Sequence, residues 1–535
     1  MPETAGPPAV EPVRFIEPVW FRSAWIQFAV ILAALATAFF PALHGYYLHT
    51  DDYFFYRASG FTAREIFLFG AAHGIPAVWL VYWMFSAVGF IKTVAGLNLV
   101  RILSTCIIST LGVILYRYLY RLLSNWLVAL AITIGLLTTP PFITYAAYFT
   151  MTPYGMGAIC ATLAWLIAST KVTVDGGKRV VFLPLAVLLM IISLCFYQVG
   201  SLFYVSLAAV ATLLADPLTF RKHFRNLFTH AGIVAVAYAI YYVSWRAWIQ
   251  SQDFPSSGKY DPRNFVTDIP GRIKWFISYP LVETSNLWLI HPNEIITLGV
   301  LAVITLAICV EYRSAPRDGQ SDYRSGVVAK GLTLVLMIPA TYGISLVSSA
   351  PSPEYRTYVA LESAIGLLFL ISLYRVCLGW RLMAPKAISF VMAAFAVFGI
   401  VSANDTVRRY FAIPDYTEFQ FVKNEIATYI HFFGGGFQHV HVLTVNRPIA
   451  PDQRNEIGEP SLQHGENIRP IVMAAFDELG IHRDVPVSHS TPQTPAKWIE
   501  WNTYLEGMVL NGQYISPTSD HVLFIDATRI PRPSE

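Results

Sequence analysis

Charged residues are scarce in this chain. Only 13% of its 535 residues are Asp, Glu, Lys or Arg, whereas 55% are hydrophobic and the mean hydropathy is +0.49. This balance excludes a string of ordinary soluble domains and indicates a polytopic membrane protein. The formal net charge is only +3, which argues against nucleic acid as a partner.

Cysteine is also rare. The five cysteines lie in or beside apolar segments and show no paired spacing of the kind that binds metal. We therefore expect them to act as small buried hydrophobic side chains. None follows Cys377, so the polar C-terminal part could lie in an oxidising compartment without forming disulfides.

Long apolar runs are present instead. A helix needs about 20 apolar residues to cross the hydrocarbon core, and this criterion predicts about eleven transmembrane helices in an all-α polytopic domain over residues 24–403. The predicted spans are 24–43, 98–119, 126–147, 153–170, 180–197, 201–215, 231–250, 294–311, 331–349, 357–374 and 385–403. Residues 1–23 are then a cytoplasmic N-terminal tail.

Lys and Arg recur in every second loop between these spans. Examples are Arg117 with Arg121, and later Arg375 with Arg381. Because short cytoplasmic loops retain basic residues, this pattern predicts that the N-terminus is inside. The apolar run 75–90 would reverse every later loop if it were a span, so we expect an interfacial or re-entrant helix within a long, structured outer loop over 44–97.

The sequence changes character after residue 403. HVHVLTVN and HVLFID have the pattern of strands, and IRPIVMAAFDELGI has the spacing of an amphipathic helix. Residues 404–535 are therefore expected to form a small α/β domain on the extracytoplasmic side. His439 and His441 alternate on one predicted strand, but without a third ligand nearby in sequence a solvated strand face is favoured over a metal site.

Two adjacent carboxylates, Asp51 and Asp52, follow the first span in the stretch HTDDYFFYR. Such a pair can simply cap a helix end in water. Here, however, aromatic residues surround the pair, and Arg57 follows it as a clamp for a phosphate or carboxylate. The stretch therefore predicts a functional site at the outer surface.

This arrangement resembles the GT-C superfamily of integral-membrane glycosyltransferases. The stretches DDYFFYR, FYQVGS at 196–201 and APSPEYRTY at 350–358 resemble, more narrowly, the bacterial glucosyltransferases that modify the O-antigen of lipopolysaccharide. The resemblance implies a location in the bacterial inner membrane with the C-terminal domain in the periplasm. It also implies a polyprenyl-phosphate sugar as donor and a glycan or lipid-linked acceptor.

Sugar transfer assigns roles to the candidate residues. The acceptor hydroxyl loses a proton as it attacks the anomeric carbon, so a carboxylate can serve as general base. We predict Asp51 as this base and Asp52 as its orienter or as a ligand of a divalent metal, whose requirement the sequence leaves open. Arginine suits the departing phosphate, and Arg356 is the only basic residue in its predicted outer loop.

The remaining candidates lie near the predicted outer ends of other spans. Their alternative role is to anchor the chain at the level of the lipid headgroups. The residues predicted to bind substrate are Arg57, Arg356, Tyr355, Gln198, Tyr197 and Arg246.

Two other functions stay open. An O-antigen polymerase or ligase would use arginines of a large outer loop, and the loop 251–293 offers Arg263 and Arg272. A transporter or flippase of lipid-linked sugars would bury charged residues at mid-membrane depth, whereas the predicted spans are nearly free of them. The early acidic pair favours the glycosyltransferase.

Overall fold

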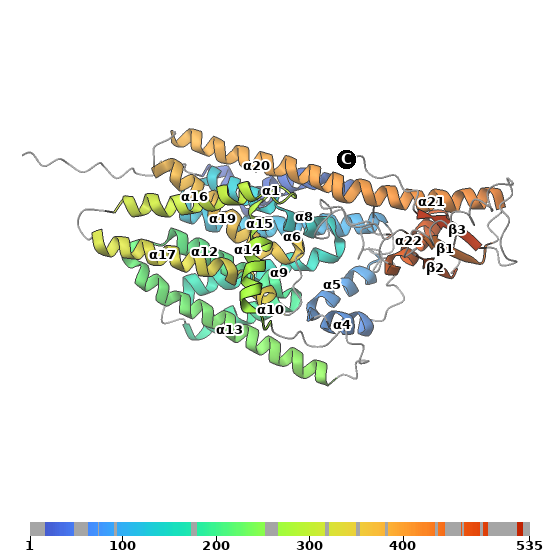
Figure 1. The fold of residues 1–535 in the computed structure, drawn as a ribbon, viewed down its shortest axis with the longest axis horizontal. Coiled ribbons are helices and arrows are strands. Elements are labelled where there is room, and N and C mark those ends of the chain that lie inside the picture. Colours follow the sequence, from blue (N-terminus) through green and yellow to red (C-terminus); the bar gives the residue numbers. More distant parts are fainter. Residues whose placement is uncertain are drawn as a thin grey trace, which may run out of the picture.

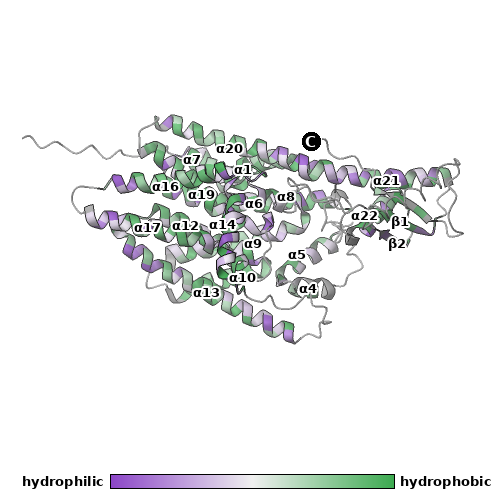
Figure 2. Ribbon diagram, in the orientation of Figure 1, coloured by the Kyte–Doolittle hydropathy of each residue, from purple (hydrophilic) through white to green (hydrophobic). Residues whose placement is uncertain are grey.

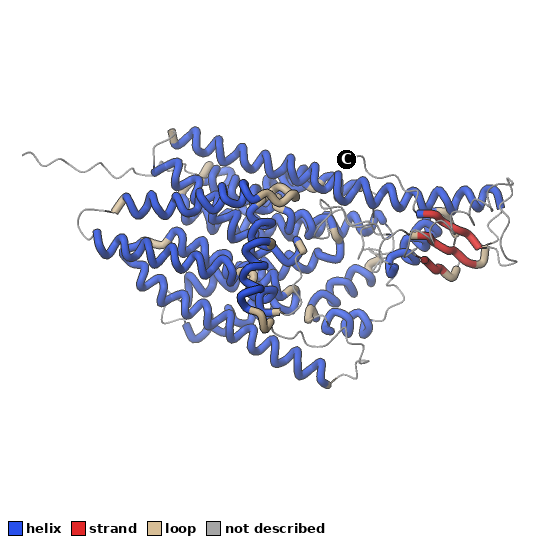
Figure 3. Tube along the Cα trace, viewed as in Figure 1, coloured by secondary structure: helices blue, strands red, loops and turns tan. Residues whose placement is uncertain are grey.

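Helices make up most of the regular structure (Figures 1 and 3). The chain is described by a computed structural model. The residues that it describes are 17–45, 47, 63–72, 74–89, 94–172, 179–251, 266–315, 320–348, 354–379, 384–433, 437–444, 462, 465–481, 485–490 and 522–527.

Long helices run side by side in a bundle whose two ends differ (Figure 1). We call the end that faces the C-terminal strands the sheet end and the opposite end the far end. The span 126–147 is divided between two helices, and each predicted span overlaps one of the longer helices of the bundle. These helices are α1 (Ala24–Ala38), α6 (Val94–Leu123), α7 (Trp126–Leu137), α9 (Thr152–Ile167), α10 (Arg179–Phe196), α12 (Phe203–Leu214), α13 (Phe220–Gln250), α16 (Glu294–Arg313), α17 (Gln320–Ala340), α19 (Tyr355–Gly379) and α20 (Pro385–Val407).

Several of these helices can cross a membrane. Within the described ranges, six helices are long and apolar enough, or seven if α7 and α8 (Pro140–Ala147), which meet at 63°, count as one broken span. The prediction of eleven spans is confirmed only to this extent. Apolar residues cover the outside of the bundle (Figure 2), and Ile295 and Phe390 are more than three-quarters exposed. Lipid would cover such surfaces, so the chain is an integral membrane protein.

Polar side chains define where several helices begin. The Asn125 side chain accepts a hydrogen bond from the Val128 amide at 3.2 Å and caps α7. Asn293 caps α16 in the same way through the amide of Ile295 at 2.9 Å. Asparagine stabilises a helix N-terminus because its side chain satisfies an amide that has no partner within the helix.

A buried ion cluster joins four helices at the far end. Lys330 is fully buried and its ammonium lies 2.8 Å from Glu311, which also lies 3.2 Å from Arg375. Lys330 and Arg375 both donate to the carbonyl oxygen of Leu213 at the end of α12. The cluster holds α12, α16, α17 and α19 together, because each buried charge has a partner.

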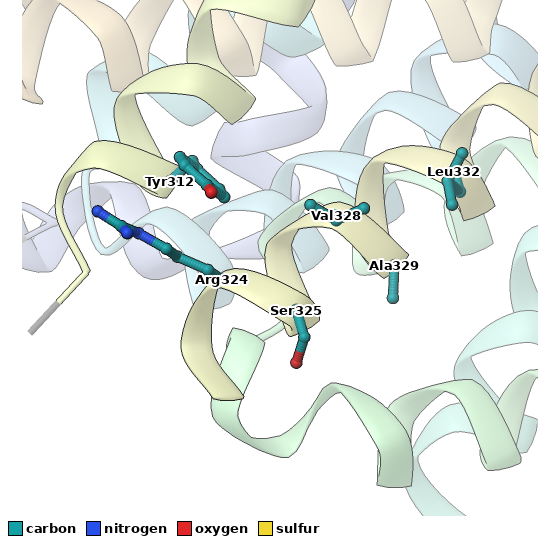
Figure 4. A pocket seen from close by; sticks show the side chains of 6 residues that line it. All are labelled: Tyr312, Arg324, Ser325, Val328, Ala329 and Leu332. Carbon is teal, nitrogen blue, oxygen red and sulfur yellow. The ribbon is translucent and has the colours of Figure 1, made fainter. Parts of the chain in front are cut away.

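A shallow hollow of about 340 Å³ also lies at the far end, between α16 and α17 (Figure 4). The Arg324 guanidinium lies over the Tyr312 ring at 5.0 Å, and the other lining residues are mostly apolar. None of the predicted site residues lines this hollow.

Shorter helices occupy the sheet end and the connections. They are η1 (Val19–Arg22), α2 (Phe40–His44), α4 (Ala63–Ala72), α5 (Pro76–Ala87), η4 (Phe149–Met151), η5 (Ala168–Val172), α11 (Gln198–Ser201), η7 (Pro217–Thr219), α14 (Ile269–Ser278), α15 (Pro280–Ser285) and α18 (Gly343–Val347). The twelve residues of α5 extend about 18 Å, well short of the roughly 30 Å hydrocarbon core. This length fits the predicted interfacial or re-entrant helix.

Helix α14 runs across the direction of the long helices (Figure 1). Ile269, Ile273 and Ile277 form an exposed stripe along it, each more than half exposed. On the same helix, the Arg272 guanidinium lies over the Trp275 ring at 5.0 Å and donates to the Ser348 carbonyl oxygen at 2.7 Å. An apolar stripe next to basic and aromatic residues is typical of a helix at a membrane surface.

The C-terminal part is carried on one long helix. α20 continues through η9 (Arg408–Ala412) into α21 (Ile413–Phe433), and together they form a helical run of 47 residues over Lys386–Phe432. A run of this length extends about 70 Å, more than twice the hydrocarbon core. It therefore reaches well beyond any membrane that the bundle crosses.

A three-stranded parallel sheet lies beside α21, with the strand order β2–β1–β3. Its elements are β1 (His439–Leu443), β2 (Val487–Ser490), β3 (Val522–Asp526) and the helix α22 (Gly465–Glu478). Val440 and Val442 are buried, whereas His439 and His441 point to the other face and are half-buried. Two predicted strands and the predicted amphipathic helix are thus present, while α21 and β2 were not predicted.

Candidate functional site

The predicted site residues fall into two groups. Asp51, Asp52 and Arg57 lie outside the described residues. The other five, Tyr197, Gln198, Arg246, Tyr355 and Arg356, all lie at the sheet end of the bundle.

A pair of stacked tyrosine rings links α9 to the junction between α10 and α11. The rings of Tyr154 and Tyr197 are 4.0 Å apart and nearly parallel. Tyr145 packs edge-on against Tyr154, and its hydroxyl donates to the carbonyl oxygen of Arg356 at 3.3 Å. Two stretches that the sequence singled out, around 197 and around 356, therefore meet in space.

Arg356 forms an ion pair at the start of α19. Its Nε lies 2.5 Å from the Glu354 carboxylate, and each side chain is 27% exposed. A partly exposed guanidinium of this kind can bind a phosphate, since arginine presents several donors in a fixed plane. An incoming phosphate would compete with Glu354 for these donors.

Gln198 faces the turn between α4 and α5. Its side-chain amide donates to the Gly74 carbonyl oxygen and to the Tyr241 hydroxyl, which itself donates to Gly74. The indole of Trp245 donates to Ala71 at 2.8 Å. Gly74 has φ +73°, and a Cβ there would collide with the Gln198 amide, so glycine is needed at this turn. Gln198 thus anchors the α4–α5 hairpin to the bundle.

Tyr355 and Arg246 make different contacts. Tyr355 is almost fully buried, and its hydroxyl donates to the Ile290 carbonyl oxygen at 3.3 Å. It therefore supports the chain that leads into α16. Arg246 contacts the Tyr242 hydroxyl at 3.4 Å, one turn earlier on α13.

Sequence reasoning missed four residues of this region: Arg101, Tyr145, Tyr154 and Glu354. For Arg101 a signal existed, because it lies inside the predicted span 98–119, and a charge within a span commonly marks a functional position. Glu354 lies in the quoted stretch APSPEYRTY, two residues before Arg356. The two tyrosines could not be distinguished from other aromatic residues near span ends.

No metal centre can be built from the part of the chain that the structure describes, since no three His, Cys, Asp or Glu side chains gather there. Metal binding through Asp52 stays a prediction, as this residue lies outside that part. On the sheet, His439 Nε2 and His441 Nδ1 lie 2.6 and 2.8 Å from the Ser488 hydroxyl. Burial, together with the imidazoles of His439 and His489, lowers the pKa of His441.

Comparison with protein families gives one match. The model of the family described as Glucosyl transferase GtrII matches residues 78–373, more than half of the chain, and this region includes Tyr197, Gln198 and Arg356. No curated protein matches the chain. The chain therefore belongs to the GtrII glucosyl transferase family.

Proposed function

We propose that this membrane glycosyltransferase is of the GT-C type and transfers glucose from a polyprenyl-phosphate donor to a glycan or lipid-linked acceptor on the periplasmic side. The observation that carries the proposal is the series of contacts that links Tyr197 to Arg356 through Tyr154 and Tyr145 at the sheet end. The first helix pair ends at the same end, so the chain reaches Asp51 soon after Tyr47. O-antigen is the acceptor class that the resemblance implies.

The reaction is a displacement at the anomeric carbon. Asp51 takes the proton of the acceptor hydroxyl while its oxygen bonds to the anomeric carbon. The bond from that carbon to the phosphate oxygen breaks, and the electron pair leaves with the phosphate. The Arg356 guanidinium stabilises the charge that develops there, and Asp52 orients the base.

The distribution of basic residues supports the proposal that the sheet end lies on the periplasmic side of the membrane. Arg117 and Arg121 lie at the end of α6, and Arg313 and Arg375 lie in the last turns of α16 and α19. All four lie at the far end of the bundle (Figure 1). Since cytoplasmic loops are enriched in basic residues, the far end is cytoplasmic and the sheet end periplasmic in this proposal. The bacterial inner membrane is then the location.

An O-antigen polymerase or ligase is the second candidate. It would rely on arginines in the loop 251–293, but the guanidinium of Arg272 already donates to Ser348 and stacks on Trp275. The family match to glucosyl transferases also favours transfer of single sugars.

The test is transfer by the full chain in lipid nanodiscs, with polyprenyl-phosphate glucose as donor and lipid-linked O-antigen as acceptor. Wild type is expected to form a glucosylated product, and Asp51→Asn to lose at least about 100-fold in turnover, as expected when a general base is removed. Arg263→Gln, in the loop that the alternative needs, is expected to retain activity. Transfer that depends on Arg263 and not on Asp51 would favour the polymerase or ligase, and movement of the lipid without product would favour a transporter.

A further inference from the structure

The outward face of α14 combines apolar surface with one positive charge. Its stripe of Ile269, Ile273 and Ile277 is more than half exposed at each position. A shallow hollow of about 520 Å³ lies beside the stripe, and its lining residues are Pro270, Ile273, Lys274, Ile277 and Ser278. None of these described lining residues is acidic, so Lys274 gives the hollow a positive character. An apolar groove beside a single cation fits an amphiphile that carries a hydrocarbon chain and an anionic head.

The opposite face of α14 packs into the protein through aromatic rings. The rings of Trp275 and Phe276 each lie 6.2 Å from the ring of Tyr342, which follows α17 and is fully buried. The Tyr342 ring in turn lies 5.6 Å from that of Tyr358. Tyr358 follows Arg356 by two residues on α19. These rings therefore connect α14 to the start of the helix that carries Arg356.

The stripe adjoins the lipid-covered surface where spans end at the sheet end. The Val266 amide, just before α14, donates to the Val347 carbonyl oxygen at 3.0 Å, and Arg272 donates to the next carbonyl, that of Ser348. Val347 is the last residue of α18, which follows the long helix α17, and its side chain is half exposed. Because α14 crosses the direction of the long helices (Figure 1), its apolar stripe continues the lipid-facing surface along the membrane boundary.

A lipid-linked donor has to approach Arg356 from within the bilayer. Its isoprenoid chain is apolar and leaves hydrocarbon only at a large cost, while its phosphate stays at the level of the headgroups. The stripe offers apolar contact at this boundary, and Lys274 offers the charge that a phosphate attracts. Resting on the proposed function, we propose that the outward face of α14 is the docking surface for the isoprenoid chain of the donor, with Lys274 beside the donor phosphate.

The experiment compares two donors with the full chain in lipid nanodiscs. One is polyprenyl-phosphate glucose, and the other is a short-chain analogue that keeps the glucosyl phosphate but has only a few isoprene units. Ile273→Ser/Ile277→Ser is expected to raise the KM for the long-chain donor by about 5-fold to 20-fold, because apolar contact with the chain is lost. The KM for the short-chain donor and the turnover with either donor should change less than about twofold.

Lys274→Gln separates the head of the donor from its chain. Both donors carry the phosphate, so this variant is expected to raise both KM values by about twofold to fivefold, as for loss of an exposed charge pair. Ile295→Ser/Leu298→Ser is the matched control, because these two apolar residues are also exposed and lie near the start of α16. The control variant should keep both wild-type KM values.

Thermal unfolding checks that the variants fold. If I273S/I277S folded and left the long-chain KM unchanged, or raised both KM values equally, the stripe would contact ordinary membrane lipid alone and the proposal would be overturned. If the double variant did not fold, Ile277→Ser would decide in the same way, with an expected rise of about threefold in the long-chain KM alone. These results reject this inference alone when wild type transfers glucose from both donors. If wild type transfers from neither donor, the proposed function itself fails.

Discussion

Replacing Arg356 should slow the chemical step far more than it weakens donor binding. The guanidinium lies at the start of α19 and is partly exposed, and the Arg356 carbonyl oxygen accepts a hydrogen bond from Tyr145, which packs against Tyr154. Removing one group that stabilises developing charge typically costs about 3–4 kcal/mol, which corresponds to a loss of about 100-fold to 1000-fold in turnover. We expect Arg356→Ala to fall in this range.

The ion pair between Arg356 and Glu354 leads to a second prediction, which concerns donor binding. Both side chains are 27% exposed, and solvent screening limits such pairs to about 0.2–1 kcal/mol. A donor phosphate that displaces Glu354 from Arg356 must overcome this interaction free energy. Glu354→Gln is therefore expected to tighten donor binding by up to about fivefold, with little change in turnover.

Initial rates at varied donor concentration, with the full chain in nanodiscs, distinguish these effects. Arg409→Ala is the control, since Arg409 is 68% exposed and forms an ion pair with Asp405, four residues earlier on the same helical run. If R356A kept wild-type turnover and raised only the donor KM, the guanidinium would bind ground state and transition state equally. That result would refute its role in stabilising the leaving phosphate.

Two further predictions concern the sheet end and the strands. Gly74→Ala should lower the free energy of unfolding by about 1–3 kcal/mol, because φ is positive there and the Cβ would displace Gln198. Thermal unfolding measures this loss. Gly232→Ala is the control and should not destabilise the protein, because a Cβ at Gly232 meets nothing within 4 Å. The pKa of His441 is lowered in the folded chain. As pH falls from 7.5, the unfolded chain therefore binds the proton at a higher pH than the folded chain does. The stability of β1 should consequently decrease below about pH 6.5. Hydrogen exchange of β1, corrected for intrinsic rates, measures this; an equal pH dependence in His441→Asn would contradict it.

The sequence predicted the helices well where apolar composition alone decides them. Each apolar run of about 20 residues is helical, in one helix or in two consecutive ones, because lipid and helix neighbours both require internally satisfied backbone groups. The prediction of one span over 126–147 does not include the break between α7 and α8, although Pro140 and Pro141 signal this break by removing two amide donors. α21 was missed because its residues are mixed polar and apolar and follow the change in composition at 403.

The candidate site was predictable only in part. Aromatic and basic residues near span ends identified Tyr197 and Arg356, but no pattern in the sequence indicates which spans are neighbours. Their proximity depends on how α8, α9 and α19 pack, and packing of helices is set by the shapes of many side chains together. Tyr355 shows the limit of composition, since it adjoins Arg356 in sequence yet its ring is buried in the core.

The tyrosine stack lies where the regular helices stop. α7 and α8 meet at a sharp bend. α10 ends at Phe196, and Tyr197 lies between it and the short α11. Such breaks leave carbonyl groups without helical partners, and in a membrane these groups must be satisfied by protein. Here the Trp288 indole and the Thr138 hydroxyl both donate to the Gly135 carbonyl oxygen, at 2.7 and 3.0 Å. Polar side chains therefore satisfy a carbonyl group beside this break, and the backbone can bend inside the bundle without leaving that group unpaired.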